Sequence, residues 1–179
     1  MAERSGRVIR SGHSNLPSVS STKAIQAGSE KPHVSPGAFE FMLKAMRYVI
    51  ALLALVGIAV SALALHVHYS TGVQPCSINA TWDCGIVNHS RYAEIAGIPV
   101  AALGIAGYAA IAILSMMRFT RLTAAAALVG FLFALYLTHV EKDILQTYCL
   151  YCVISQITIA IILLAASFVT IRQGDWKRD

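Results

Sequence analysis

Four long apolar runs dominate this chain and limit it to folds that face lipid as well as protein. A helix needs about 20 predominantly apolar residues to cross the hydrocarbon layer of a membrane, and each run approaches or reaches that length. Only 13% of the residues are charged, whereas a typical soluble domain has about 25%. We therefore predict an all-α membrane protein, with a bundle of four transmembrane helices. The runs span residues 48–65, 98–117, 122–137 and 148–171.

The apolar runs divide the chain into three segments. Residues 1–44 precede the first run, and their polar part is rich in Ser, Gly, Arg and Lys and lacks apolar periodicity, so we expect a disordered tail. Residues 45–172 are predicted to form the membrane domain, and residues 173–179 are predicted to form a short C-terminal tail.

The basic residues are distributed unevenly among the segments that join the predicted helices. Of the 14 Lys and Arg residues, only Arg91 and Lys142 lie in the loops 66–97 and 138–148. Cytoplasmic segments carry an excess of Lys and Arg, so both termini are predicted in the cytoplasm and these two loops outside. Because the other basic residues flank apolar runs instead of clustering on a folded domain, the net charge of +5 does not indicate nucleic acid binding.

The four cysteines form two pairs, which this orientation places on one side of the membrane. Cys76 and Cys84 lie in the first outer loop, and Cys149 and Cys152 form a CxxC motif at the outer end of the last helix. That side is the oxidising one, where disulfides persist. The dipole and free N–H groups of a helix N-terminus favour a thiolate, so Cys149 is expected to be reactive. A flexible loop can bring a sulfur to Cys149, as thiol–disulfide exchange requires.

Two other interpretations of the cysteines stay open at this point. The chain is a non-enzymatic scaffold if both pairs are structural disulfides on an outer face. A structural zinc site also fits the number of cysteines, although an oxidising compartment disfavours it. Histidines near the outer face are more typical of interfacial anchors than of metal ligands, so no metal site is predicted. These histidines are His66, His68, His89 and His139.

A thiol relay needs an electron acceptor. The sequence contains no dinucleotide-binding fingerprint after a strand and no CxxCH haem motif, so a lipid-soluble quinone is the expected acceptor. Ser155 and Gln156 continue the cysteine face of the last helix into the bilayer, where polar side chains are functional candidates. Hydrogen bonding between helices is the alternative role for these two residues.

Several motifs of the chain resemble those of the vitamin K epoxide reductase family. One is Ala64-Leu65-His66-Val67 at the end of the first helix, and another is the CxxC motif that opens a late helix. The segment 84–100 also fits, with Ser90 six residues after Cys84 and a Gly-Ile-Pro sequence ahead of the second helix. The similarity covers about residues 46–171. DsbB-type oxidases, in contrast, carry their CxxC motif early in the chain.

The resemblance implies a four-helix bundle around a quinone, with the first outer loop capping the active site. It implies that Cys76 exchanges with a thioredoxin-like partner and that Cys84 passes electrons to Cys149. Cys152 would then face the quinone, and Ser90 would support the loop. The residues expected around the quinone are Val100, Gly104, Tyr108, Ser155 and Gln156.

Two departures distinguish the chain from the animal members of this family. Val100 stands where those enzymes have an Asn that contacts the quinone, and Gln156 stands where they have a Tyr. The thioredoxin-like domain fused to many bacterial members is also not expected here. These differences favour a bacterial inner-membrane enzyme that reoxidises a separate DsbA-like protein, drives disulfide formation in exported proteins and reduces ubiquinone or menaquinone. Reduction of vitamin K epoxide or quinone with dithiol electrons is the alternative.

Overall fold

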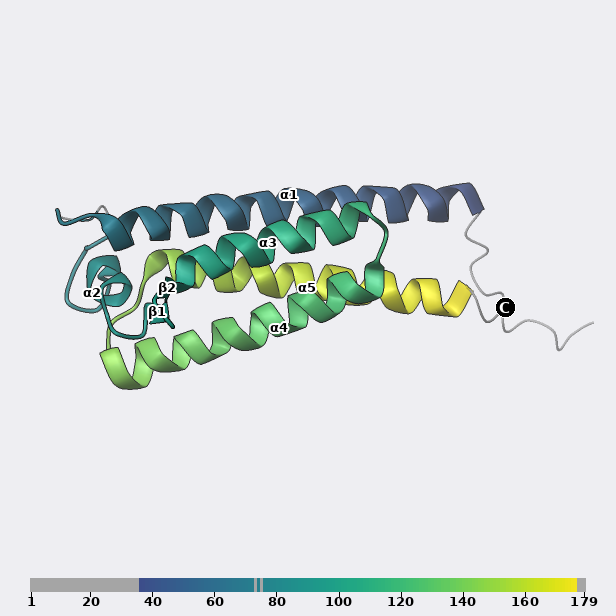
Figure 1. Cartoon of the computed structure of the whole chain (residues 1–179). Helices are drawn as coiled ribbons and strands as arrows, with labels where there is room; N and C mark the ends of the chain where they lie inside the picture. Colours follow the sequence, from purple (N-terminus) through teal and green to yellow (C-terminus); the bar gives the residue numbers. More distant parts are fainter. Residues whose placement is uncertain (1–35, 73, 75, 177–179) are drawn as a thin grey trace, which may run out of the picture. The chain divides into compact units, whose positions relative to one another are not determined.

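The computed structural model describes residues 36–72, 74 and 76–176. Four long helices run alternately up and down and pack as a bundle, in which α1 contacts α3 and α5, and α4 contacts the same two helices (Figure 1). The helices are α1 (Pro36–Tyr69), α3 (Val100–Met116), α4 (Thr120–His139) and α5 (Leu150–Trp176). The predicted helical class is therefore confirmed.

Membrane-spanning length distinguishes three of these helices from the fourth. Within the described residues, the segments Glu40–Tyr69, Thr120–Leu145 and Leu150–Gly174 are long and apolar enough to cross a bilayer. The remaining apolar helix, α3, has 17 residues, which extend about 26 Å at 1.5 Å per residue. Large apolar side chains are exposed along the outer faces of the helices, including Leu52, Val129 and Leu164. Water disfavours such a surface and lipid accepts it, so the protein is an integral membrane protein.

The ends of the helices differ from the expected boundaries. Helix α1 begins at Pro36, inside the predicted tail of residues 1–44. Proline suits the first position of a helix because its missing N–H needs no partner there, and Ala, Glu, Met, Leu and Lys follow it. Helix α5 likewise continues past residue 172 to Trp176. The expected disorder of residues 1–35 lies outside the described residues.

The loop expected at residues 138–148 is largely helical. Helix α4 leads directly into a π-helix, η1 (Val140–Leu145), which ends at Gln146 with a left-handed backbone (φ 53°). The N–H of Thr147 donates to the carbonyl of Glu141 at 3.1 Å and closes this turn. Val140 and Glu141 are buried, whereas Lys142 and Asp143 are exposed. The chain thus reaches the CxxC motif with one acidic side chain turned inward.

The first outer loop folds into a cap at the end of the bundle where α5 begins (Figure 1). It contains the short helix α2 (Cys84–Asn88) and a hairpin of β1 (Glu94–Ile95) and β2 (Ile98–Pro99). The hairpin turns through Ala96 and Gly97, both with positive φ (52° and 78°), as a two-residue type I′ turn requires. Helix α3 begins at the residue after the hairpin, so no linker separates the cap from the bundle.

Candidate active site

All four cysteines meet beneath the cap. Cys76 and Cys84 form a disulfide with their Cα atoms 5.7 Å apart, and Cys149 and Cys152 are free. Cys76, Cys84 and Cys149 are buried in one apolar cluster, against which Cys152 packs. A zinc site made from the two cysteine pairs would need all four sulfurs as ligands, and the Cys76–Cys84 bond is incompatible with that arrangement.

Backbone hydrogen bonds hold the cysteine loop against the CxxC segment. The N–H of Tyr148 donates to the carbonyl of Thr81 at 2.8 Å, and the N–H of Asp83 donates to the carbonyl of Tyr148 at 3.1 Å. The rings of Trp82 and Tyr148 lie 5.6 Å apart and cover this contact. Cys84 and Cys149 each follow a residue of this bridge directly, which explains how two distant segments bring their sulfurs together.

Asp83 fixes the start of α2, where Cys84 is the first helical residue. Its carboxylate accepts hydrogen bonds from the N–H of Gly85 at 2.8 Å, the N–H of Ile86 at 3.1 Å and the hydroxyl of Ser77 at 2.9 Å. The bonds from Ile86 and then Ser77 are the main reasons that the pKa of Asp83 is lowered. The ionised carboxylate is thus the helix cap that orders the backbone around Cys84.

Asn88 connects the cap to the sulfur of Cys149. Its side-chain amide donates to the carbonyl of Cys84 at 2.8 Å and to Sγ of Cys149 at 3.4 Å. The pKa of Cys149 is lowered, mainly by a hydrogen bond from the Cys152 thiol, and burial opposes this effect. The backbone N–H of Cys152 and the amide of Asn88 lower it further. Cys149 precedes the first residue of α5, and its carbonyl accepts from the N–H of Val153 at 3.1 Å. Donors at the start of α5 and in the cap thus favour the thiolate of Cys149.

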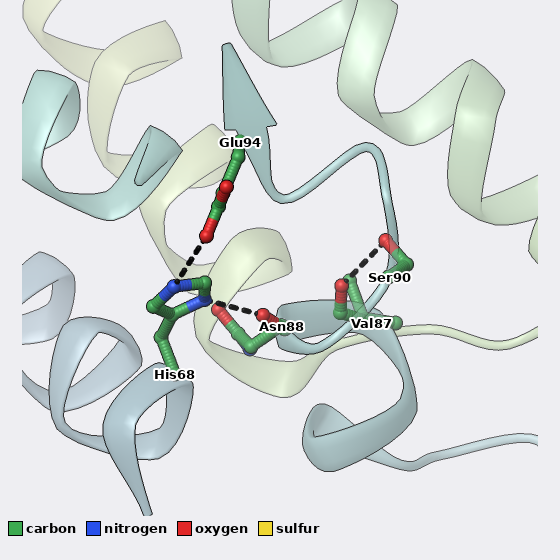
Figure 2. A network of polar contacts seen from close by, with 5 residues as sticks. All are labelled: His68, Val87, Asn88, Ser90 and Glu94. Atoms are coloured by element: carbon green, nitrogen blue, oxygen red, sulfur yellow. Dashed lines mark hydrogen bonds and ion pairs between the residues drawn. The ribbon is translucent and has the colours of Figure 1, made fainter. Parts of the chain in front are cut away.

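His68, at the end of α1, positions the residues of the cap (Figure 2). Its Nδ1 donates to the backbone carbonyl of Asn88 at 2.6 Å, and its Nε2 lies 3.2 Å from a carboxylate oxygen of Glu94. The hydroxyl of Ser90 donates to the carbonyl of Val87 at 2.8 Å. This bond closes the turn after α2.

A cavity of about 730 Å³ lies within the bundle beneath the cap. Its walls come from all four long helices, from η1 and from the cap, and they are mostly apolar. Small-molecule sites in proteins typically have volumes of about 300–1,000 Å³ and few polar groups. Cys152 lines this cavity, whereas Cys149 is not in its lining. The two sulfurs of the CxxC motif therefore face different surroundings.

The comparison with known families agrees with this arrangement. The model of the vitamin K epoxide reductase family matches residues 48–167 of the chain. The chain belongs to this family. No curated protein matches it. Membership in the vitamin K epoxide reductase family makes the protein an oxidoreductase of the membrane type that couples disulfides to quinone-like substrates, and it confirms the family predicted from the motifs.

Four of the five residues expected around the quinone line the cavity: Val100, Gly104, Tyr108 and Ser155. The hydroxyl of Tyr108 bonds the carbonyl of Ser155 at 2.8 Å and its hydroxyl at 2.9 Å. Gln156, the fifth, is outside the lining, because its amide oxygen accepts a hydrogen bond from Thr138 at the contact between α4 and α5. Gln156 therefore forms a hydrogen bond between helices, which is the alternative role given for it above.

Two glycines allow the cavity wall to form. A Cβ atom at Gly57 would lie 2.4 Å from the ring of Tyr108, so this ring packs directly on the backbone of α1. A Cβ atom at Gly104 would lie 2.8 Å from Oγ of Ser61, which shows how closely α1 and α3 approach. Gly57 was not among the predicted residues, because a single Gly in an apolar helix carries no signal of its partner.

Three polar residues near the cysteines were missed as site residues: Asn88, Glu94 and Glu141. Asn88 and Glu94 stand in a loop whose fold the sequence did not predict. The sequence places Glu141 in the predicted outer loop 138–148, although Val140, Ile144 and Leu145 continue the apolar pattern of the preceding run. That continuation indicates a longer helix, which would include Glu141.

Proposed function

We propose that the protein is a dithiol:quinone oxidoreductase that takes two electrons from a separate thioredoxin-fold protein of the DsbA type and passes them to a membrane quinone. The observation that carries this proposal is the division of the CxxC pair. Cys149 lies in the apolar cluster with the loop disulfide, and Cys152 lines the cavity. A relay with thiol exchange on one side and a quinone on the other needs this division.

The relay proceeds through mixed disulfides. A thiolate of the partner attacks Cys76 and releases the Cys84 thiolate. The partner's second thiol then attacks the partner's first sulfur and displaces the Cys76 thiolate, which leaves the partner oxidised. Cys84 attacks Cys149 of an oxidised CxxC pair and releases Cys152. Cys76 then attacks Cys84, which re-forms the loop disulfide and leaves Cys149 and Cys152 reduced. The quinone takes two electrons and two protons as the CxxC disulfide re-forms.

The acceptor we propose is ubiquinone or menaquinone. An apolar cavity with Tyr108 and Ser155 on its wall supports a ring with polar oxygens, and its place among membrane helices supports a lipid-soluble molecule. With Val100 in the wall, the cavity lacks at that point the side-chain amide that the animal enzymes offer to the quinone. This difference favours disulfide formation over epoxide reduction as the physiological direction.

The proposed reaction is tested with the purified protein in lipid, a reduced DsbA-like protein and short-chain ubiquinone or menaquinone. We expect quinone absorbance to fall with wild-type protein and to stay constant with Cys152→Ala, because the sulfur at the cavity wall is removed. In the same variant without reduced partner, the Cys149 thiolate can attack Cys84 of the loop disulfide and release Cys76. A Cys84–Cys149 disulfide is therefore expected to accumulate, detectable by mass spectrometry. Undiminished quinone reduction by Cys152→Ala would sink the proposal, and turnover of vitamin K epoxide in a parallel assay would favour the alternative reaction.

We further propose that α3 is a fourth span and that both termini face the cytoplasm of a bacterial inner membrane. The excess of Lys and Arg at the end of the bundle opposite the cap supports this orientation. An impermeant maleimide applied to intact cells is expected to label Thr71→Cys at the cap end and to leave Arg121→Cys, between α3 and α4, unlabelled. Both substitutions are made in a chain without native cysteines. The reverse pattern would overturn the orientation.

A further inference from the structure

The side chain of Glu141 is a buried carboxyl without partners. Its exposed fraction is 2%, and neither carboxylate oxygen has a hydrogen-bond partner. Among the described residues, no Lys, Arg or His forms an ion pair with it. An ionised carboxylate buried in this way is costly, and taking up a proton removes much of that cost. A residue kept in such a place needs an explanation other than packing.

The surroundings of Glu141 are those of the reaction. It lines the same cavity as Cys152. The Cys152 thiol and the backbone N–H of Cys149 are its neighbours, although neither reaches hydrogen-bond geometry. The π-helix η1 turns this side chain inward, while Lys142 and Asp143 in the same element stay exposed. Short π-helical turns often occur at functional sites, and this one delivers a carboxyl to the cavity side of the CxxC pair.

We propose that Glu141 carries a proton from the thiol of Cys152 to an oxygen of the quinone. This inference rests on the function proposed above. It names a catalytic residue in addition to the four cysteines, since the carboxyl stands beside a reacting thiol and on the wall of the site that the quinone would occupy. Thr147 holds the backbone of Glu141 through the 3.1 Å bond to its carbonyl, which leaves the carboxyl itself available.

The reduced CxxC pair enters the proposed step as a Cys149 thiolate and a Cys152 thiol. Cys152 gives its proton to the Glu141 carboxylate, and the two sulfurs form a disulfide as two electrons pass to the quinone. Glu141 gives that proton to one quinone oxygen, and water supplies the second proton, which replaces the one that Cys149 had lost. The products are the disulfide and the hydroquinone, with Glu141 again ionised.

The test compares Glu141→Gln with wild type in lipid, with reduced DsbA-like protein and short-chain quinone. The amide keeps the size of the side chain but cannot carry the proton. Quinone reduction is therefore expected to fall by about 100-fold, which is the lower end of the effect of proton transfer by a positioned side chain. Oxidation of the partner by the Cys76–Cys84 disulfide, measured without quinone, is expected to be unchanged. Glu141→Asp retains a carboxyl and should recover part of the rate.

Two further measurements exclude a structural role. Asp143→Asn removes an exposed carboxylate from the same π-helix and serves as the matched control, with a rate near wild type. Glu141→Gln should unfold at the same temperature as wild type or higher, because a costly buried charge is lost. A wild-type protein that reduces no quinone defeats the proposed function. A Glu141→Gln protein that reduces quinone as fast as an active wild type, or that fails only because it unfolds, overturns this inference alone.

Discussion

The two sides of the CxxC pair differ in how their polar groups are satisfied. On the cap side, the side chains of Asp83, Asn88 and Ser90 all have hydrogen-bond partners within the cap or on Cys149, although Asn88 and Ser90 also reach the cavity wall. On the cavity side, the wall is mostly apolar, and both oxygens of Glu141 lack partners. Buried polar groups normally have hydrogen-bond partners. These cap side chains find theirs within the protein, whereas the Glu141 carboxylate in the cavity wall has none and could bond a molecule that enters the cavity.

This contrast assigns different tasks to the two regions. The cap holds the backbone at Cys84 and the sulfur of Cys149 at fixed places, which suits exchange between sulfurs of one chain. The cavity keeps Cys152 and Glu141 at an apolar wall, which suits a partner that must enter and leave. Substitutions on the cap side should therefore change the thiol chemistry, and substitutions in the cavity wall should change the use of the quinone.

The largest effect outside the cysteines and Glu141 is expected for Gly57→Ala on the cavity side. The added Cβ atom would lie 2.4 Å from the ring of Tyr108, whose hydroxyl is held by Ser155. Overpacking of this kind costs about 1–3 kcal/mol, so the quinone concentration for half-maximal rate should rise by about tenfold as the ring shifts into the cavity. Thiol exchange with the partner should stay at the wild-type rate.

Gly37→Ala is the matched control for Gly57→Ala, since a Cβ atom at Gly37 in the same helix would have nothing within 4 Å. It should leave the quinone dependence unchanged. An equal change in both variants, or a Gly57→Ala protein with the quinone dependence of wild type, would contradict the claim that the packing of the cavity wall controls the use of the quinone.

On the cap side, Asn88→Ala should slow the reaction of Cys149. The amide donor to its Sγ is lost, and a hydrogen bond to a charged group is worth about 1.5 kcal/mol or more. The pKa of Cys149 should therefore rise, and its alkylation rate at neutral pH, followed residue by residue by mass spectrometry, should fall about tenfold. Asn88→Asp places a carboxylate there and should lower the rate further. A rate for Asn88→Ala equal to that of wild type would remove Asn88 from the thiol chemistry.

The part of the molecule that the sequence could predict is the part with local signals. Apolar runs indicate helices in lipid, and the CxxC motif and the loop pair indicate the sulfurs, because each pattern lies within a few residues. Ser155 and Gln156 show the limit. They are neighbours on α5, about 100° apart around its axis, and one lines the cavity while the other bonds Thr138. The rotation of α5 relative to α4 determines which of the two side chains faces the cavity. The sequence of α5 alone does not indicate that rotation.

The smallest effect is expected for Asp83→Asn, at the N-terminus of α2. The pKa of Asp83 is lowered by its hydrogen bonds to Ile86 and Ser77, so its ionised form stabilises the folded cap. That contribution is present above the pKa of the unfolded chain, near 3.9, and is lost as the pH falls through the lower folded value. Because the group lies at the surface, water screens it, and the loss should be below about 1 kcal/mol.

Amide hydrogen exchange over residues 84–88 measures this loss. The protection of wild type relative to Asp83→Asn, taken at each pH so that intrinsic exchange cancels, should be constant near neutrality and should shrink below about pH 4. Asparagine is itself a good helix cap, so the two proteins should approach each other in acid, where the aspartate is also neutral. A ratio that stays constant down to pH 2 would show that the charge of Asp83 does not hold the cap. In that case the fixed geometry around Cys84 would rest on the backbone bridge to Tyr148 and on the Asn88 hydrogen bond to the carbonyl of Cys84.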